Sequence, residues 1–316
     1  VSFNPKHEEA LFRCLSAAEK AKLPKATAIH FCVISARRTS DPMSIKRCML
    51  VQQSFKAVGI EPRWYVDAKS LSNYRRLGFD AVEDGGSLVG ARNKALNEAK
   101  RLGKPCCEVS DDISRWAYYG SLEQTVVKDD KEANRLARSG RHLVVSPVAA
   151  ARFLLARMRT NDAKPKLAGI LPDGNIARGL SKASVTTKNF ILGDFFVSDV
   201  GSAVRFDRKL TLKEDYDFTC SHIERYGAVL RCNRMVIDVA HYTNAGGAVS
   251  VRNDSEEQKN IKILREKWPK AIRLHPTREN EVVLSWPKRA VPPRKLPARR
   301  PVIKSAKLKA KSRAKS

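Results

Sequence analysis

The chain has 316 residues, of which 42% are hydrophobic, so it can build a sizeable core and is not an intrinsically disordered protein. It carries 60 Lys and Arg against 33 Asp and Glu, which gives a formal net charge of +27. This excess favours a polyanionic partner such as nucleic acid, although a general solubility role is the alternative explanation. No apolar run reaches the length of a membrane span, and no secretory signal pattern is visible. We therefore expect a soluble intracellular protein, in the cytoplasm of a bacterial or virus-infected cell or in a eukaryotic nucleus.

The first 120 residues predict alternating helices and strands. A charged amphipathic pattern at 6–22 predicts a helix, and the continuous apolar run at 28–35 predicts a strand buried on both faces. Further strands are expected at 62–67, 79–82 and 105–110, with helices at 42–58, 71–77 and 88–102 between them. This alternation is typical of a parallel sheet covered by helices.

The second half of the chain is less regular. We expect helical structure at 119–141 and 217–226, and strands at 168–172, 190–197, 229–232 and 236–239. The last 29 residues combine proline with twelve Lys and Arg and no acidic residue, a composition typical of disorder. The expected organisation is an N-terminal helical extension at 1–24, one α/β domain at 25–286 and a disordered basic tail at 287–316.

The seven cysteines argue against two kinds of stabilisation. Their number is odd and none lies in a CxxC pair, so a disulfide framework and a zinc site are both disfavoured.

Four polar motifs could carry chemistry. Asp111 and Asp112 directly follow an apolar strand and offer oxygen ligands for Mn²⁺ or Mg²⁺, although such a pair more often caps a turn or a helix. The glycine turn at 85–86 leads into a helix that carries Arg92 and Asn93, which could face an anion or simply begin the helix. The turn is neither a Walker A loop nor a GxGxxG motif, so no dinucleotide is inferred.

The other two motifs come later in the chain. Glu214, Asp215 and Asp217 crowd three carboxylates into four residues, where one pKa can rise far enough for a general base, although an acidic helix start is equally ordinary. His241 follows a strand and precedes a glycine-containing stretch; a neutral imidazole there could complete a metal site, but a lone histidine is usually structural.

Taken in order, these motifs over residues 28–245 resemble glycosyltransferases of the GT-A fold. The Ala91-Arg92-Asn93 helix, the Ser110-Asp111-Asp112 stretch and the 213–218 acidic segment are most similar to the TET/JBP-associated glycosyltransferases, a group that includes the base J glucosyltransferase. The metal motif departs from the family pattern, because it reads Ser-Asp-Asp and not Asp-x-Asp.

The resemblance implies a GT-A-like, Rossmann-type mixed and mainly parallel sheet, and transfer of glucose from UDP-glucose to hydroxymethylated pyrimidines in DNA. The residue roles that it implies, together with our choices for the acceptor, are these: nucleotide-sugar binding by Arg92, Asn93, Asp111 and Ser35; Mn²⁺ or Mg²⁺ binding by Asp112 and His241; catalysis by Asp215 or Glu214; and acceptor or DNA contacts by Trp116, Tyr118, Asp217, Arg299 and Arg300.

Three alternatives remain open from the sequence. The same enzyme class could use a protein, a glycan or a small molecule as acceptor. The chain could be a non-catalytic, basic nucleic-acid-binding protein whose carboxylates only cap helices. A nucleotidyltransferase would also use paired carboxylates, but it needs an early phosphate-binding loop that the sequence lacks. The oligomeric state is not readable from the sequence.

Overall fold

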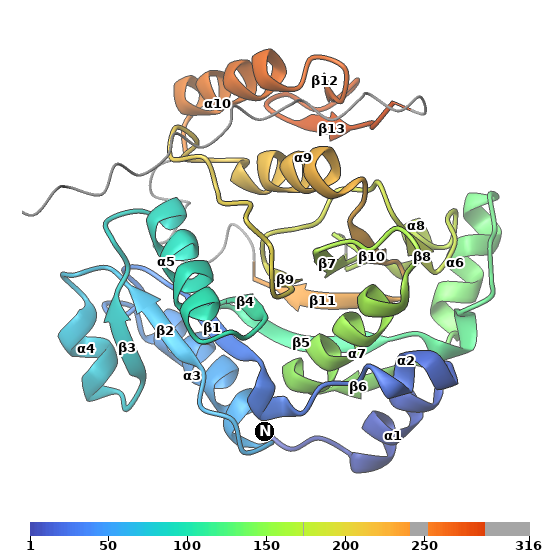
Figure 1. Cartoon of the computed structure of the whole chain (residues 1–316), viewed down its shortest axis with the longest axis horizontal. Helices are drawn as coiled ribbons and strands as arrows, with labels where there is room; N and C mark the ends of the chain where they lie inside the picture. Colours follow the sequence, from blue (N-terminus) through green and yellow to red (C-terminus); the bar gives the residue numbers. More distant parts are fainter. Residues whose placement is uncertain (173, 241–251, 288–316) are drawn as a thin grey trace, which may run out of the picture.

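An eight-stranded sheet forms the centre of the protein, with helices on both faces (Figure 1). The structure is a computed structural model, and it describes residues 1–172, 174–240 and 252–287. Within these residues the sheet has the strand order β3-β2-β1-β4-β9-β7-β10-β8. His241, Arg299 and Arg300, and nearly all of the expected basic tail, lie outside the described residues.

The first half of the sheet is parallel and follows the predicted alternation. It consists of β1 (His30–Ile34), α3 (Pro42–Lys56), β2 (Arg63–Val66), α4 (Leu71–Arg76), β3 (Asp80–Glu83), α5 (Leu88–Arg101) and β4 (Cys106–Ser110). Phe31 and Val33 of β1 are buried in the core on one face of the sheet and Cys32 in the core on the other, which explains why this strand reads as a continuous apolar run.

The second half of the sheet is mixed. Strand β9 (Phe195–Ser198) lies antiparallel between β4 and β7 (Leu167–Ile170), while β10 (Leu230–Cys232) runs parallel to β7. The short strand β8 (Val185–Thr186) pairs antiparallel with β10 at the far edge. The prediction of a mixed α/β fold with a mainly parallel central sheet between helices is confirmed.

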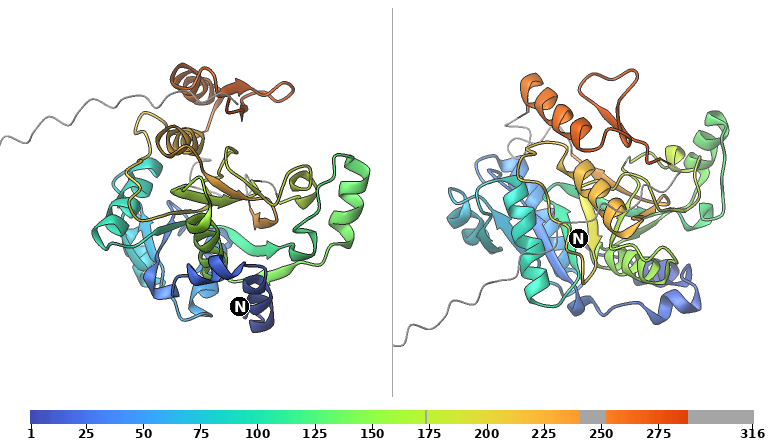
Figure 2. Two further views of the ribbon diagram at one scale, coloured as in Figure 1. Left: turned by 45° about the vertical axis from the view of Figure 1, so that its right-hand side comes forward. Right: turned by 45° about the horizontal axis from the view of Figure 1, so that its top comes forward.

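Two separate cores cover the two faces of the sheet. On one face α3 and α7 (Pro147–Thr160) enclose a core that includes Phe55 and Phe153. On the other face α5 and α9 (Glu214–Tyr226) enclose a core that includes Leu96 and Phe218. Figure 2 shows the resulting layers from two further directions.

A small second sheet extends the first beyond the end of β4. It pairs β11 (Met235–Val239) with β5 (Ile113–Tyr118), and β5 with β6 (Leu143–Val145), all antiparallel. Helices α6 (Asp130–Ser139) and α8 (Ile176–Gly179) contact each other beside it.

The expected N-terminal helix is interrupted. Instead of one helix at 6–22, α1 (Pro5–Arg13) and α2 (Ala17–Ala21) are separated at Ser16, whose side chain accepts a hydrogen bond from the Glu19 amide while Glu19 caps the Ser16 amide. Leu11 and Leu15 are buried in the main core, so these helices pack on the α/β body.

The C-terminal described residues form a third layer above α9 (Figure 1). Helix α10 (Asp254–Lys267) and the hairpin of β12 (Ile272–Leu274) and β13 (Val282–Leu284) share a small core with α9 through Cys220. We call residues 252–286 the C-terminal cap.

Three predicted elements need correction. The segment 119–141, expected to be helical, contains only α6 and a 3₁₀ turn at Gly120–Leu122. The stretch after residue 143, read as irregular, holds helix α7, which is apolar on nearly every side and therefore lacks a helical hydrophobic stripe. The strand expected at 190–197 is confined to β9, because residues 190–194 bend across the start of α9.

Candidate functional site

A cavity of about 1250 Å³ opens at the carboxyl ends of β1 and β4. In the strand order β3-β2-β1-β4, the chain adds β2 and β3 on one side of β1 and then adds β4 on the other side. The direction of strand addition therefore reverses between β1 and β4. Open α/β sheets bind ligands at such a switch point, because the loops that leave the two strands diverge there. The residues at 35–38, 86–89, 91–92, 110–112 and 214–216 all line this cavity.

Asp111 is the centre of a buried hydrogen-bond network at this point. Its Oδ2 atom accepts hydrogen bonds from Ser35 Oγ at 2.5 Å and from Arg38 Nε at 2.9 Å. The Ser35 hydroxyl lies 2.6 Å from the Tyr74 hydroxyl. Burial raises the pKa of Asp111, and the Arg38 guanidinium opposes that rise. Asp111, to which Ser35 also donates, therefore holds Arg38 at the cavity wall.

Asp112 also lines the cavity, with 7% of its surface exposed, at the turn between β4 and β5. Asp194 comes to the same place, because its carbonyl accepts the Ser110 amide at 2.8 Å. These carboxylates are oxygen donors of the kind that Mn²⁺ and Mg²⁺ prefer. Among the described residues, however, no three His, Cys, Asp or Glu side chains form a metal-binding group. The other expected ligand, His241, is outside that set.

Arg92 lies between the sheet and α9, where it bridges several groups. Its Nη1 atom contacts Glu108 Oε2 at 3.2 Å and donates to the Gly193 carbonyl at 2.9 Å, while its Nε atom lies 3.3 Å from Glu214 Oε1. Arg92 is 7% exposed. The guanidinium is thus committed to protein partners, and its geometry is that of a positioning residue for the acidic segment.

The Gly193 peptide continues this chain of contacts to Asp215. Its amide donates to Asp215 Oδ2 at 3.1 Å, while its carbonyl accepts from Arg92. A Cβ atom at residue 193 would lie 2.7 Å from Arg92 Nη2, a distance that real Cβ atoms do not show. Glycine is therefore required for this close approach.

The two carboxylates at the start of α9 differ in exposure. Glu214 is buried against Arg92, whereas Asp215 is partly exposed on the cavity wall. Burial and then repulsion from Glu214 raise the pKa of Asp215 to about 7, although Arg92 and the Gly193 amide oppose the rise. A carboxylate that titrates near neutral pH is suited to accept a proton from a hydroxyl group.

Asn93 has a structural contact instead of a place at the cavity. Its side-chain nitrogen donates to the Phe206 carbonyl at 2.9 Å, and its oxygen accepts the Phe206 amide at 2.9 Å. These two hydrogen bonds fix the segment before α9 to α5. The described structure gives Asn93 no contact with the cavity.

Three residues expected to contact the acceptor lie in the protein interior. Trp116 and Tyr118 in β5 are fully buried, with Trp116 against Phe195 and Tyr118 against Phe153. Asp217 is also buried and accepts a hydrogen bond from Trp268 Nε1 at 2.7 Å. None of the three lines the cavity, so the expectation that they contact the acceptor is corrected.

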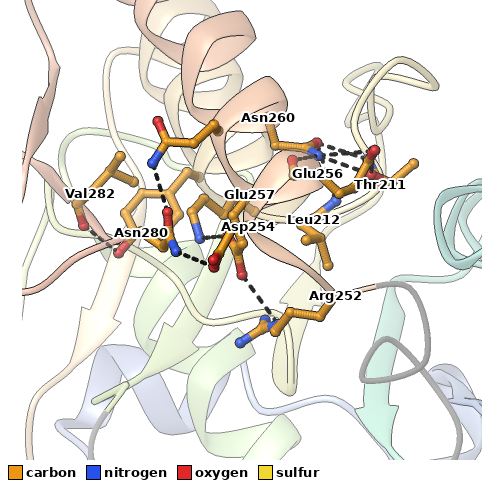
Figure 3. Close-up of polar contacts among 12 residues, drawn as sticks. Thr211, Leu212, Arg252, Asp254, Glu256, Glu257, Asn260, Asn280 and Val282 are labelled. Carbon is orange, nitrogen blue, oxygen red and sulfur yellow. Dashed lines mark hydrogen bonds and ion pairs between the residues drawn. The ribbon is translucent and has the colours of Figure 1, made fainter.

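The C-terminal cap is attached to the acidic segment by polar contacts (Figure 3). Asn260 Oδ1 accepts the amides of Thr211 at 2.9 Å and Leu212 at 3.2 Å. Glu257 forms ion pairs with Arg252, at 3.3 Å, and with Lys213, the residue that precedes α9. Lys213 has a left-handed backbone with φ of 57°, so the cap stabilises the turn that starts α9.

Sequence patterns gave no sign of several cavity residues. Arg38 and Asp194 lie outside every motif, and Phe190 stands in a segment read as a strand. Five exposed arginines also line the cavity from separate segments: Arg37, Arg178, Arg208, Arg252 and Arg278. The only available signal for the arginines was the overall basic charge of the chain.

Comparison of the chain with protein-family models, curated proteins and solved structures finds no match. In the part of the chain that the structure describes, no helix has the length and apolar composition needed to cross a membrane. The functional assignment consequently depends on the geometry of the cavity.

Proposed function

We propose that this chain is a metal-dependent glycosyltransferase of the GT-A type that transfers a sugar, with glucose as the expected one, from a UDP-sugar to the hydroxymethyl group of a modified pyrimidine in DNA. The observation that supports this most is the convergence of two acidic pairs. Asp111-Asp112 and Glu214-Asp215 are about a hundred residues apart in sequence and line one cavity at the switch point of the sheet.

The two pairs suit different tasks. Asp112, with His241 as its expected partner, would hold Mn²⁺ or Mg²⁺. When bound, the ion would neutralise the charge that develops on the diphosphate leaving group. Asp111 would orient Arg38 beside the donor, together with Ser35.

Asp215 is our candidate for the general base. It is partly exposed on the cavity wall, its pKa lies near 7, and the Gly193 amide fixes one of its oxygens. In that position it would accept the proton of the acceptor hydroxyl as the oxygen attacks the sugar, which gives inversion if attack is in line with the leaving group. Arg92 holds Glu214 and the Gly193 peptide, so it supports Asp215 indirectly.

A DNA acceptor agrees with the charge distribution. The cavity wall is acidic at the proposed reacting groups, whereas exposed arginines line it from five segments and the chain carries a net charge of +27. Arginines bind phosphates and release counterions from DNA. A base within a duplex must leave the stack to enter such a cavity. The protein would then act in the compartment that holds the DNA.

The decisive experiment is a transfer assay. Purified protein is incubated with Mn²⁺, a panel of UDP-sugars and DNA that contains hydroxymethylcytosine or hydroxymethyluracil, and the digested nucleosides are examined for an added hexose by mass spectrometry. Asp112→Ala and Asp215→Asn are expected to abolish the product. Asp80→Asn, which changes an exposed carboxylate outside the cavity, is the matched control and should retain activity.

The other outcomes separate the alternatives. Release of UDP without modification of DNA would leave a glycosyltransferase that uses a protein, glycan or small-molecule acceptor. Absence of both UDP-sugar binding and turnover would favour a non-catalytic nucleic-acid-binding protein.

A further inference from the structure

An aromatic pair stands on the cavity wall beside the proposed base. The rings of Phe190 and Tyr216 are stacked, with centroids 3.9 Å apart and planes 13° from parallel. Both side chains line the cavity and both are partly exposed. Tyr216 directly follows Asp215, so Tyr216 and the carboxylate belong to the same turn of α9, while Phe190 comes from the segment before β9.

The segment that carries Phe190 is fixed along the first turns of α9. The Ile191 amide donates to Thr219 Oγ1 at 3.2 Å, and the Gly193 amide donates to Asp215 Oδ2 at 3.1 Å. These contacts set the position of Phe190 relative to Asp215.

Two further hydrogen bonds, with partners outside α9, hold Phe190 and Tyr216 in place. Arg231 Nη1 donates to the Phe190 carbonyl at 3.3 Å, from strand β10. The Tyr216 hydroxyl donates to the Val282 carbonyl at 2.9 Å, from the C-terminal cap. The aromatic surface is therefore preorganised by the sheet on one side and by the cap on the other.

The chemistry of this wall favours a planar ring. The cavity lining mixes charged and apolar side chains, and Phe190 and Tyr216 are the two aromatic residues among the described ones that line it. Every nucleobase has a π face that stacks on such a surface regardless of its hydrogen-bonding edge. Arg208, which is exposed and also lines the cavity, supplies a positive charge for the phosphates next to a stacked base.

We propose that Phe190, supported by Tyr216, is the platform on which the acceptor nucleobase stacks so that its hydroxymethyl group faces Asp215. This proposal rests on the proposed function, because it assumes that the acceptor is a base in a nucleic acid. It replaces Trp116 and Tyr118, which are buried in the core, as the aromatic contact for the acceptor.

The test compares two single-stranded oligonucleotides that differ at one position. One carries hydroxymethylcytosine and the other an abasic site, and the dissociation constant of each is measured by fluorescence anisotropy without donor. Loss of one stacking contact corresponds to about tenfold in affinity. The wild-type protein should bind the base-containing strand about tenfold more tightly than the abasic strand.

Three variants separate stacking from structural damage. Phe190→Leu should lose the preference for the base while it keeps its affinity for the abasic strand, and Phe190→Trp should retain the preference. Phe12→Leu is the matched control, since Phe12 is also partly exposed and has a packing partner, the Arg152 guanidinium, but lies outside the cavity. It should behave like the wild-type protein.

Several results would overturn the platform: equal binding of both strands by the wild-type protein, a full base preference in Phe190→Leu, or equal weakening of both strands in that variant. The proposed function is judged separately by sugar transfer. Base preference without transfer would keep the platform and remove the glycosyltransferase. Transfer without base preference would keep the enzyme and remove the platform.

Discussion

Replacement of Gly193 by alanine should disturb the proposed catalytic group while the fold persists. The new Cβ would lie 2.7 Å from Arg92 Nη2, 3.3 Å from Arg92 Cζ and 3.4 Å from Asp215 Cβ. Since an ordinary contact begins at 3.4 Å, the guanidinium and the backbone at 193 must separate by about 0.7 Å. Arg92 cannot move freely, because Glu108 and Glu214 hold it on two other sides.

The size of the effect follows from this displacement. The Gly193 amide binds Asp215, so a shift of the backbone moves the carboxylate as well. A misplacement of about 1 Å can reduce a rate by about a hundredfold. For the smaller shift here we expect kcat to fall by about ten- to a hundredfold, with little change in the affinity for UDP.

The assay is steady-state sugar transfer, with urea unfolding as the test of the fold. Gly174→Ala is the control substitution, because its added Cβ would meet only the Ile237 carbonyl, at 3.4 Å. A Gly193→Ala variant with wild-type kcat and normal stability would refute the view that Arg92 and the Gly193 peptide position Asp215.

Four further predictions concern charge and stability. Transfer should accelerate as the pH rises through about 7, because Asp215 accepts a proton only when ionised; a kcat/KM profile that is flat from pH 5.5 to 9 would contradict this. Burial raises the pKa of Glu108 to about 8, so the native state keeps a proton that the unfolded chain has lost above about pH 4.3, and stability should fall as the pH rises between these values. Urea unfolding at pH 5.5 and 8.5 should show a smaller fall in Glu108→Gln than in the wild type. Arg234→Met should lose about 3–5 kcal/mol in urea unfolding, because the fully buried guanidinium donates to backbone carbonyls of several loops; a loss below about 1 kcal/mol would exclude that role. Trp268→Phe should cost about 1.5–3 kcal/mol by the same measurement, since it removes the hydrogen bond to the buried Asp217 carboxylate, and an unchanged unfolding midpoint would count against it.

The part of the fold that the sequence predicted is the part with local patterns. Strands β1 to β4 and the helices between them follow one another along the chain, so each boundary has its own cap, glycine or apolar run. Helix α7 was missed because Phe153, Leu154 and Leu155 are buried all around its circumference and leave no stripe. Strand β5 was missed because its pairing with β11 joins residues more than a hundred apart, such as Trp116 and Ile237.

The candidate site shows the same division. The carboxylates at 111–112 and 214–215 could be selected from the sequence, since each pair follows a recognisable strand or begins a helix. The partners of these carboxylates could not, because Arg38 reaches Asp111 across 73 positions and Arg92 reaches Gly193 across 101. Which aromatic residues line the cavity also depends on burial, which the sequence does not show. The aromatic residues of β5 are buried in the core, whereas Phe190, in a segment without a motif, lines the cavity.

The position of β9 also bears on how the protein folds during synthesis. Strands β1 to β4 are complete by Ser110, but in the described structure the outer edge of β4 pairs with β9, which ends at Ser198. At ordinary rates of translation the ribosome needs on the order of ten seconds to supply those residues. Throughout that interval the nascent sheet presents an apolar strand edge, the feature that most readily recruits another chain. The interval between synthesis of β4 and of β9 is therefore the stage at which this fold is most exposed to misassembly. Nascent chains that end in this interval are the ones that we expect chaperones to bind.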